Sequence, residues 1–255
     1  MKKVFALAAA LLLTVGAMSA QNTFKGIVKY KIESTGTTAM QIPEQIATAE
    51  IKVMGEQMYT KSYMFSQGSE VFVKGLKQTQ CVDNSMYITY LNAQGYEFEN
   101  YKGDGKFLLE HTYNASTLDS LEIKDTEPGH FYFEYVDGET KEIAGQTCYK
   151  LIQHYYNDEG NETQFVMWYA KNIGPAYNVI FEGVKGMPLE YTMNLGEGRA
   201  ITCTAIEVVS GKVKDVDFLF PDGYKKPTKE ELEAFSTDLQ DAKEMGYLPS
   251  GGDDE

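Results

Sequence analysis

Short segments in which apolar and polar residues alternate dominate the chain. In residues 26–32, GIVKYKI, Val28, Tyr30 and Ile32 alternate with Lys29 and Lys31, which is the period of a β-strand with one solvent-exposed face. Similar segments, rich in Tyr, Phe, Val, Ile and Thr, occupy residues 49–55, 57–65, 69–75, 85–91, 96–101, 130–136, 148–156, 162–170, 189–195 and 200–209. Gly, Asn and Asp residues separate many of them. The pattern predicts a mainly β protein built on an antiparallel sheet.

A β-hairpin is predicted over residues 154–169, HYYNDEGNETQFVMWY. Its turn residues, 157–161, lie between two segments rich in aromatic residues. We therefore expect His154 and Trp168 to lie on neighbouring strands.

Residues 228–248 break the strand pattern and predict an amphipathic helix. Thr228 and Glu231 have the spacing of a capping box, which satisfies free N–H groups at a helix start. Gly246 suits the end of the helix. Apolar residues recur at helical spacing at Leu232, Phe235, Leu239 and Ala242. We expect this face to pack on the sheet, either as a lid over a cavity or as a surface helix that completes the core.

The first twenty residues have the pattern of a secretory signal peptide. Lys2 and Lys3 precede the apolar run VFALAAALLLTVGAM, which leads into small residues. This run is shorter than the roughly 20 residues that a transmembrane helix needs. We expect cleavage after Ala20, with cleavage after Ser19 as the alternative. The mature chain is then exported to the periplasm, and outer-membrane association or secretion remains open.

The rest of the chain predicts one domain and a tail, since no linker or repeat of fixed period divides it. Residues 21–227 form the antiparallel β domain, and residues 228–248 form the helix packed on it. Residues 249–255 form a disordered acidic tail. We expect a monomer.

The chain is strongly acidic. Removing residues 1–20 removes two of the 23 basic residues and none of the 37 acidic ones, which changes the formal charge from −14 to −16. Such a charge argues against nucleic acid as a partner and against adsorption on an anionic membrane. It is compatible with one apolar lipid bound inside a cavity. No later segment is long and apolar enough for a transmembrane anchor in the mature chain.

Candidate catalytic chemistry is sparse. The three histidines, His111, His130 and His154, do not have the spacing of common metal sites. The chain contains no GxSxG motif, no phosphate-binding glycine loop before a helix and no CxxC motif. We predict a non-enzymatic protein with no catalytic residue, no metal and no cofactor.

The three cysteines, Cys81, Cys148 and Cys203, lie far apart in the sequence. Export permits oxidation, so one pair is a candidate disulfide, and the preferred pair is Cys148 with Cys203. The alternative is that all three are buried thiols that act as small apolar side chains.

Aromatic residues and methionine are abundant enough either to fill a β core or to line an apolar cavity. A core is the default, but a large curved sheet with few helices to cover it also suits a bound lipid or acyl chain. The candidate ligand-binding residues are Tyr30, Phe72, Phe133, Tyr155 and Trp168.

The segments IAGQTCYKLIQHY, MWYAKNIGP and FEGVKGMPLEY follow one another between residues 143 and 191. Their order resembles an exported Gram-negative family named for a GLPGLI motif, and a related exported family of unknown function. The matching positions are Gly145, Cys148, Trp168, Tyr169, Gly174, Pro175, Gly186, Pro188 and Leu189. This chain has KGMPLEY in place of GLPGLI, so the family of unknown function is the closer match. Gly186 predicts a tight turn, and Pro188 predicts the entry to an edge or terminal strand.

This resemblance implies a LolA-like fold, in which a half-open antiparallel barrel holds helices against its concave side. Some folds of this type carry lipids or lipoproteins, and the resemblance brings no catalytic residues. We therefore expect a binder or carrier of an apolar ligand in the concavity. The alternative is an envelope protein-interaction module that acts through edge strands and an acidic surface. The sequence DSL at residues 119–121 also resembles a short bacterial O-glycosylation acceptor, with Ser120 as the modified residue.

Overall fold

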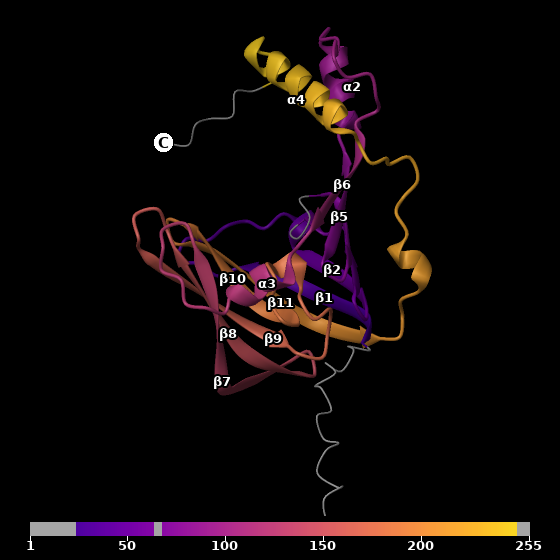
Figure 1. Cartoon of the computed structure of the whole chain (residues 1–255). Coiled ribbons are helices and arrows are strands. Elements are labelled where there is room, and N and C mark those ends of the chain that lie inside the picture. Colours follow the sequence, from indigo (N-terminus) through magenta and orange to yellow (C-terminus); the bar gives the residue numbers. More distant parts are fainter. Residues whose placement is uncertain (1–23, 64–67, 249–255) are drawn as a thin grey trace, which may run out of the picture.

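The computed structural model describes residues 24–63 and 68–248. Within these residues the strands form one antiparallel sheet, in the order β6-β5-β4-β3-β2-β1-β11-β10-β9-β8-β7. The strands are β1 (Lys25–Ser34), β2 (Thr48–Met54), β3 (Gln57–Thr60), β4 (Glu70–Lys74), β5 (Lys77–Asp83), β6 (Lys106–Thr112), β7 (Phe131–Ile143), β8 (Gln146–Tyr156), β9 (Glu162–Ala170), β10 (Met187–Gly196) and β11 (Arg199–Ser210). The sheet is open and strongly curved (Figure 1), which confirms the predicted fold class.

Two of the sequence predictions fall outside the described residues. These are the signal peptide, residues 1–20, and the acidic tail, residues 249–255. In the part of the chain that the structure describes, no helix is long and apolar enough to cross a membrane.

The middle of the sheet is made from the two ends of the β domain. Strand β1 pairs with β2 on one side and with β11 on the other, with a bulge between Lys29 and Tyr30 in the β11 pairing. Val28, Tyr30 and Ile32 are buried, as their alternation with lysines predicts. Each such side chain contributes about 1.5–3 kcal/mol when it leaves water.

The concave side of the sheet is largely filled. Residues 171–186, which include the 3-10 helix η2 (Val179–Phe181), lie against it together with helix α3 (Ala115–Ser120) (Figure 1). Val184 of this segment and Leu118 of α3 belong to the same apolar cluster as the strand residues. The shorter 3-10 helices η1 (Glu44–Ile46) and η3 (Asp215–Phe218) lie elsewhere in the chain.

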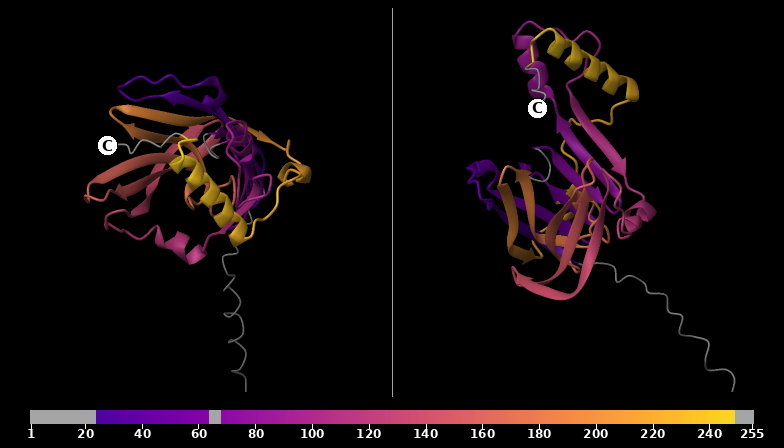
Figure 2. Two further views of the ribbon diagram at one scale, coloured as in Figure 1. Left: turned by 90° about the horizontal axis from the view of Figure 1, so that it is seen from above. Right: turned by 90° about the vertical axis from the view of Figure 1, so that its left-hand side faces the viewer.

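Strands β5 and β6 extend beyond the rest of the sheet as an arm (Figure 2). The arm carries helix α2 (Ser85–Ala93) near its end, and helix α4 (Lys229–Glu244) lies against it. The predicted capping box is confirmed at the start of α4, since Glu231 N donates to Thr228 Oγ1 at 3.2 Å and Thr228 N donates to Glu231 Oε2 at 2.9 Å. Helix α4 therefore meets the sheet at the arm, where Phe235 packs on Phe107 of β6.

A buried carboxylate fixes α4 to the arm. Asp238 is 0% exposed, and its carboxylate accepts hydrogen bonds from the backbone N–H groups of Glu99 (3.1 Å), Asn100 (3.1 Å) and Tyr101 (2.7 Å). The side-chain amide of Asn100 donates a further bond at 3.0 Å. Burial alone raises the pKa of this carboxyl, but the backbone N–H groups outweigh it and hold the pKa below its usual value.

The predicted strand over residues 85–91 is wrong, because this segment is helix α2. Its β-branched and aromatic residues favour a strand, but Ile88 and Leu91 are spaced to face the arm together, and Leu91 packs against Ala242 of α4. The predicted strand over residues 96–101 is also wrong, since these residues form the loop that binds Asp238.

Candidate ligand-binding groove

A groove of about 570 Å³ lies between β7, β8, β9 and β10 and the segment that contains η2. Nine of its lining side chains are apolar or aromatic: Phe131, Tyr155, Phe165, Met167, Ile180, Phe181, Tyr191, Met193 and Leu195. The other four are Gln153, Glu182, Thr192 and Asn194. Among the residues that the structure describes, Glu182 is thus the only charged one in this lining.

The register of four strands places the apolar and aromatic strand side chains of this lining on one face. Phe131 of β7 lies opposite Tyr155 of β8, and Gln153 of β8 lies opposite Phe165 of β9. Met167 of β9 lies opposite Tyr191 of β10. Because residues directly opposite each other in an antiparallel pair share a face, the groove continues across all four strands.

The rim of the groove is polar where η2 ends. Glu182 caps η2 with a left-handed backbone (φ 56°), which is uncommon for a residue other than glycine. Its exposed carboxylate accepts a hydrogen bond from Gln153 Nε2 at 2.7 Å through Oε2. Among residues 24–63 and 68–248, no hydrogen-bond partner is present for the other oxygen, Oε1.

The segment FEGVKGMPLEY forms the turn that holds η2 against the sheet. Gly186 has φ 123°, and a side chain there would place Cβ 2.4 Å from the backbone oxygen of Ala170. Gly183 has φ 97°, and its missing side chain makes room for Leu118 of α3. The predicted tight turn at Gly186 is therefore present. Pro188 lies near the start of β10, which is an interior strand and not an edge strand.

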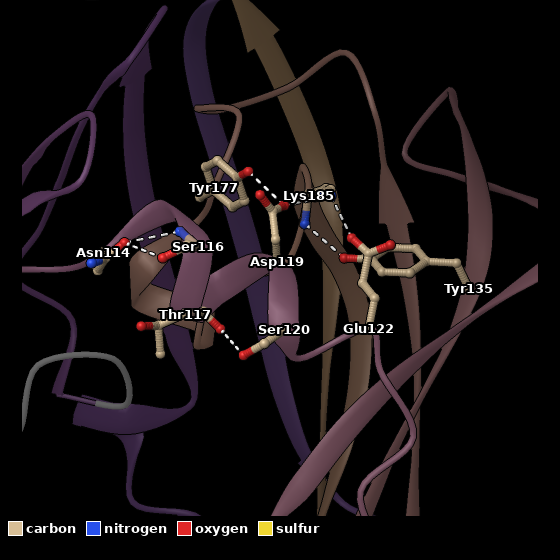
Figure 3. Close-up of polar contacts among 9 residues, drawn as sticks. All are labelled: Asn114, Ser116, Thr117, Asp119, Ser120, Glu122, Tyr135, Tyr177 and Lys185. Carbon is tan, nitrogen blue, oxygen red and sulfur yellow. Dashed lines mark hydrogen bonds and ion pairs between the residues drawn. The ribbon is translucent and has the colours of Figure 1, made fainter.

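Lys185 ties this turn to α3 (Figure 3). Its ammonium pairs with Asp119 at 3.1 Å and with Glu122, and Tyr177 donates a hydrogen bond to Asp119 at 2.7 Å. The backbone N–H of Lys185 donates to the hydroxyl of Tyr135 at 3.1 Å. Burial alone lowers the pKa of Lys185, but the bonds to the two carboxylates outweigh it and raise the pKa above its ordinary value.

Ser120 lies at the end of α3, beside this turn. Its side chain is exposed, and its hydroxyl donates to the carbonyl of Thr117 at 2.7 Å (Figure 3). O-glycosylation of Ser120 stays a prediction, and the exposed hydroxyl is compatible with it.

The structure separates the five aromatic residues predicted to bind a ligand. Tyr155 lines the groove, and Phe133 is buried in the core next to it. Tyr30 is fully buried, and its hydroxyl donates to the carbonyl of Pro188 at 2.8 Å. Phe72 lies elsewhere, in ring contact with Tyr59 and Phe220. Trp168 follows the groove residue Met167 in β9, so its side chain lies on the opposite face of the sheet. There the ammonium of Lys141 is 5.8 Å from the centre of the Trp168 ring.

The remaining motif positions are structural in this fold. Ala144 and Gly145 both have positive φ and form the tight turn between β7 and β8. Gly174 has φ 85°, and it precedes Pro175 in the segment that covers the concave side.

All three cysteines are buried free thiols in this structure, so the predicted bridge between Cys148 and Cys203 is not formed here. Cys148 lies on β8 and Cys203 on β11, with two strands between them in the sheet. Burial raises the pKa of Cys81 and of Cys148 to about 11, which keeps both thiols protonated at neutral pH.

The structure gives two histidines carboxylate partners that the sequence spacing did not indicate. His154 of β8 lies between Glu162 of β9, 2.6 Å from Nδ1, and Glu134 of β7, 2.9 Å from Nε2. His130 lies 2.7 Å from Asp125 through Nδ1.

A metal ion can be held by three or more His, Cys, Asp or Glu side chains whose ligating atoms lie close together. In the part of the chain that is described, one such group is present, Asp125, Glu127 and His130, whose ligating atoms lie within 4.8 Å of one another. They lie in a loop before β7. The backbone N–H of Glu127 donates a hydrogen bond to Asp125 Oδ1 at 3.0 Å, which also accounts for the arrangement.

No family model and no curated protein matches this chain. Several solved structures are similar. Lipoprotein LppX of Mycobacterium tuberculosis is 13% identical, with a TM-score of 0.27, and the match covers 76% of this chain and 90% of LppX. The LolA superfamily protein NE2245 of Nitrosomonas europaea is 11% identical, with a TM-score of 0.31 and coverage of 79% and 91%.

A third match is the MucA/MucB complex of Pseudomonas aeruginosa, at 11% identity and a TM-score of 0.33, with coverage of 79% and 58%. At these TM-scores the likeness says nothing of what this chain binds.

Proposed function

We propose that this protein is a non-enzymatic binder or carrier of an apolar ligand, which it holds in the groove between β7, β8, β9 and β10. The observation that carries the proposal is the lining itself, in which nine of thirteen side chains are apolar or aromatic. A volume of about 570 Å³ lies within the range of small-molecule sites, which is about 300–1,000 Å³.

The chemistry of the lining favours a flexible apolar chain such as an acyl group. Met167 and Met193 are unbranched and adapt their shape to a ligand, while Phe165 and Tyr191 supply flat apolar walls. Each methylene that leaves water in such a groove contributes about 0.8 kcal/mol to binding. Micromolar binding needs about 8 kcal/mol net. A chain of about 16 carbons gives about 13 kcal/mol, which leaves about 8 kcal/mol after about 4–5 kcal/mol is subtracted for the loss of ligand motion.

The neutral fluorescent probe N-phenyl-1-naphthylamine tests this proposal in titrations with the mature protein. Phe165→Asp places a charge in the groove and should weaken probe binding at least tenfold. Val166→Asp is the matched control, because Val166 is the next residue of β9, is 41% exposed and lies on the opposite face. Equal probe binding by the two variants would contradict the proposal.

The same groove should be occupied when the protein is isolated from its host without detergent. Native mass spectrometry followed by organic extraction should then give a bound lipid or acyl compound. Protein that is consistently empty, and that also fails to bind the probe, would remove the carrier function.

The proposed carrier acts after export, in the periplasm, with outer-membrane association or secretion left open. Edman sequencing or intact mass of the exported chain tests the predicted start at Gln21. The same mass reports any sugar on Ser120, and the extra mass should be absent from a Ser120→Ala variant.

A second candidate function, protein–protein interaction, is favoured by helix α2. The helix has no charged residue, and it exposes Met86 (81%), Tyr87 (55%) and Tyr90 (53%) at the far end of the arm (Figure 2). Large exposed apolar side chains in one patch are typical of interaction sites. A photocrosslinker at Tyr90 in intact cells should trap a specific protein, and a crosslinker at exposed Lys229 of α4 should not.

A further inference from the structure

The groove has a negative charge at its rim and no positive one in its lining. Glu182 is exposed, and the other twelve lining residues include no Lys, Arg or His. The whole chain is acidic as well, at −14. The electric field at the mouth of the groove therefore disfavours an anionic head group and favours a cationic one.

The nearest lysine in the sequence does not offset this charge. Lys185 is three residues from Glu182, but its ammonium is held by Asp119 and Glu122. Because both of its partners are carboxylates of the α3 region, the local group of three carries a net negative charge. Among the described residues that line the groove, a ligand carboxylate thus finds no cationic side chain.

The geometry of Glu182 also presents an unused acceptor. Gln153 holds the carboxylate through Oε2 at 2.7 Å, which fixes its orientation, and Oε1 has no hydrogen-bond partner in the described part of the chain. The left-handed backbone at Glu182 places this residue at the end of η2, whose Phe181 lines the apolar part. Uncommon backbone geometry at a binding wall is frequently associated with function.

We propose that the groove selects amphiphiles whose head group is an ammonium, and that Glu182 is the residue that selects them. This inference rests on the proposed function, since it names the ligand class for the same groove. The apolar chain lies along Phe165 and Met167, and the ammonium donates to the carboxylate of Glu182 at the rim. A carboxylate of equal chain length loses this bond and is repelled.

Two ten-carbon ligands, decylammonium and decanoate, test the proposal in competition with N-phenyl-1-naphthylamine at pH 7.5 and low ionic strength. Both are ionised at this pH, so they differ in the sign of the head group. Decylammonium should displace the probe at a concentration about tenfold lower than decanoate, because one head group is attracted and the other repelled. Salt at 0.5 M should reduce the difference.

Glu182→Gln keeps the size of the side chain and removes the charge, so the preference should fall to about twofold. The control is Glu233→Gln, which changes the net charge equally on the exposed face of α4 and should keep the tenfold preference. A variant with an unchanged melting temperature shows that the fold is intact.

The outcomes separate the inference from the proposed function. Decanoate that binds as well as decylammonium overturns the head-group selection and leaves the groove as a binder of apolar chains. A preference that survives in Glu182→Gln overturns the role of that residue. Failure of both ligands, and of the probe itself, overturns the proposed function together with the inference.

Discussion

Asp238 provides the most direct test of how the arm is held together. Its buried carboxylate accepts four hydrogen bonds from the loop that follows α2. Replacing it by asparagine keeps one acceptor oxygen and turns the other acceptor into an N–H donor, which faces N–H groups of the loop. At least two of the four bonds are therefore lost in Asp238→Asn.

The size of the stability loss in Asp238→Asn follows from the charge of the carboxylate acceptor. Hydrogen bonds to charged groups contribute about 1.5–3 kcal/mol each, so the loss of two costs about 3 kcal/mol or more. Because α4 contacts the arm and not the centre of the sheet, this cost should appear as local opening of the arm. A change of about 3 kcal/mol corresponds to a roughly 100-fold rise in the open population.

Amide hydrogen exchange measured by mass spectrometry resolves this change along the chain. Peptides from α2 and α4 should lose about 100-fold in protection in Asp238→Asn, while peptides from β10 and β11 should keep theirs. Asp241→Asn is the matched control, since Asp241 is one turn further along α4 and its carboxylate makes no hydrogen bond with a described residue. Unchanged protection of α4 in Asp238→Asn would refute the reasoning.

The pH dependence has a definite sign. The pKa of Asp238 is lower in the folded chain than in the unfolded chain, where aspartate has a pKa of about 3.9. Its stabilisation is therefore complete well above pH 3.9 and is lost as the pH falls through the folded value. Protection of α4 in the unmodified protein should fall in acid, and this loss should be smaller in Asp238→Asn.

Further outcomes are expected at other positions. Gly186→Ala forces Cβ against a backbone oxygen and should lower the free energy of unfolding in urea by about 3 kcal/mol or more. Gly145→Ala has open space around the new Cβ and should cost only about 1–2 kcal/mol. Equal costs would contradict the packing argument. Tyr30→Phe, which leaves a buried carbonyl without its donor, should cost about 1–2 kcal/mol by the same measurement, and no loss would mean that the bond contributes nothing. NMR titration should find the pKa of His130 above 6.5, because of its hydrogen bond to Asp125, and Asp125→Asn should lower it; the stabilisation from this pair should be lost as the pH rises through the raised pKa. Denatured protein prepared without reductant should contain three free thiols per chain, and one free thiol would indicate a disulfide.

Local patterns were sufficient to predict several elements. The alternation in β1 gives the correct buried face, and the capping box at Thr228 gives the start of α4 within one residue. Both signals depend only on neighbouring residues, so no knowledge of the tertiary structure is needed. The prediction for residues 85–91 failed because the partner that stabilises a helix there, α4, is more than 130 residues later in the chain.

The groove was only partly predictable, for a different physical reason. Alternation shows which residues share a face, but it does not show what covers that face. Phe72, for example, lies in ring contact with Phe220, which comes from a distant segment of the chain. Glu182 gave no signal at all, because its position at the rim depends on how residues 171–186 fold back onto the sheet.

The central pairing of β1 with β11 also constrains the order in which the molecule can assemble. Lys29 and Glu207, which face each other across this pair, are 178 residues apart. The first strand therefore has one open edge until nearly the whole chain is available, and contacts this distant form slowly because a long loop must close. An open edge of this kind is also a template for pairing between chains. The two halves of the sheet are joined last, by a strand that leaves the ribosome only after every other strand has been made.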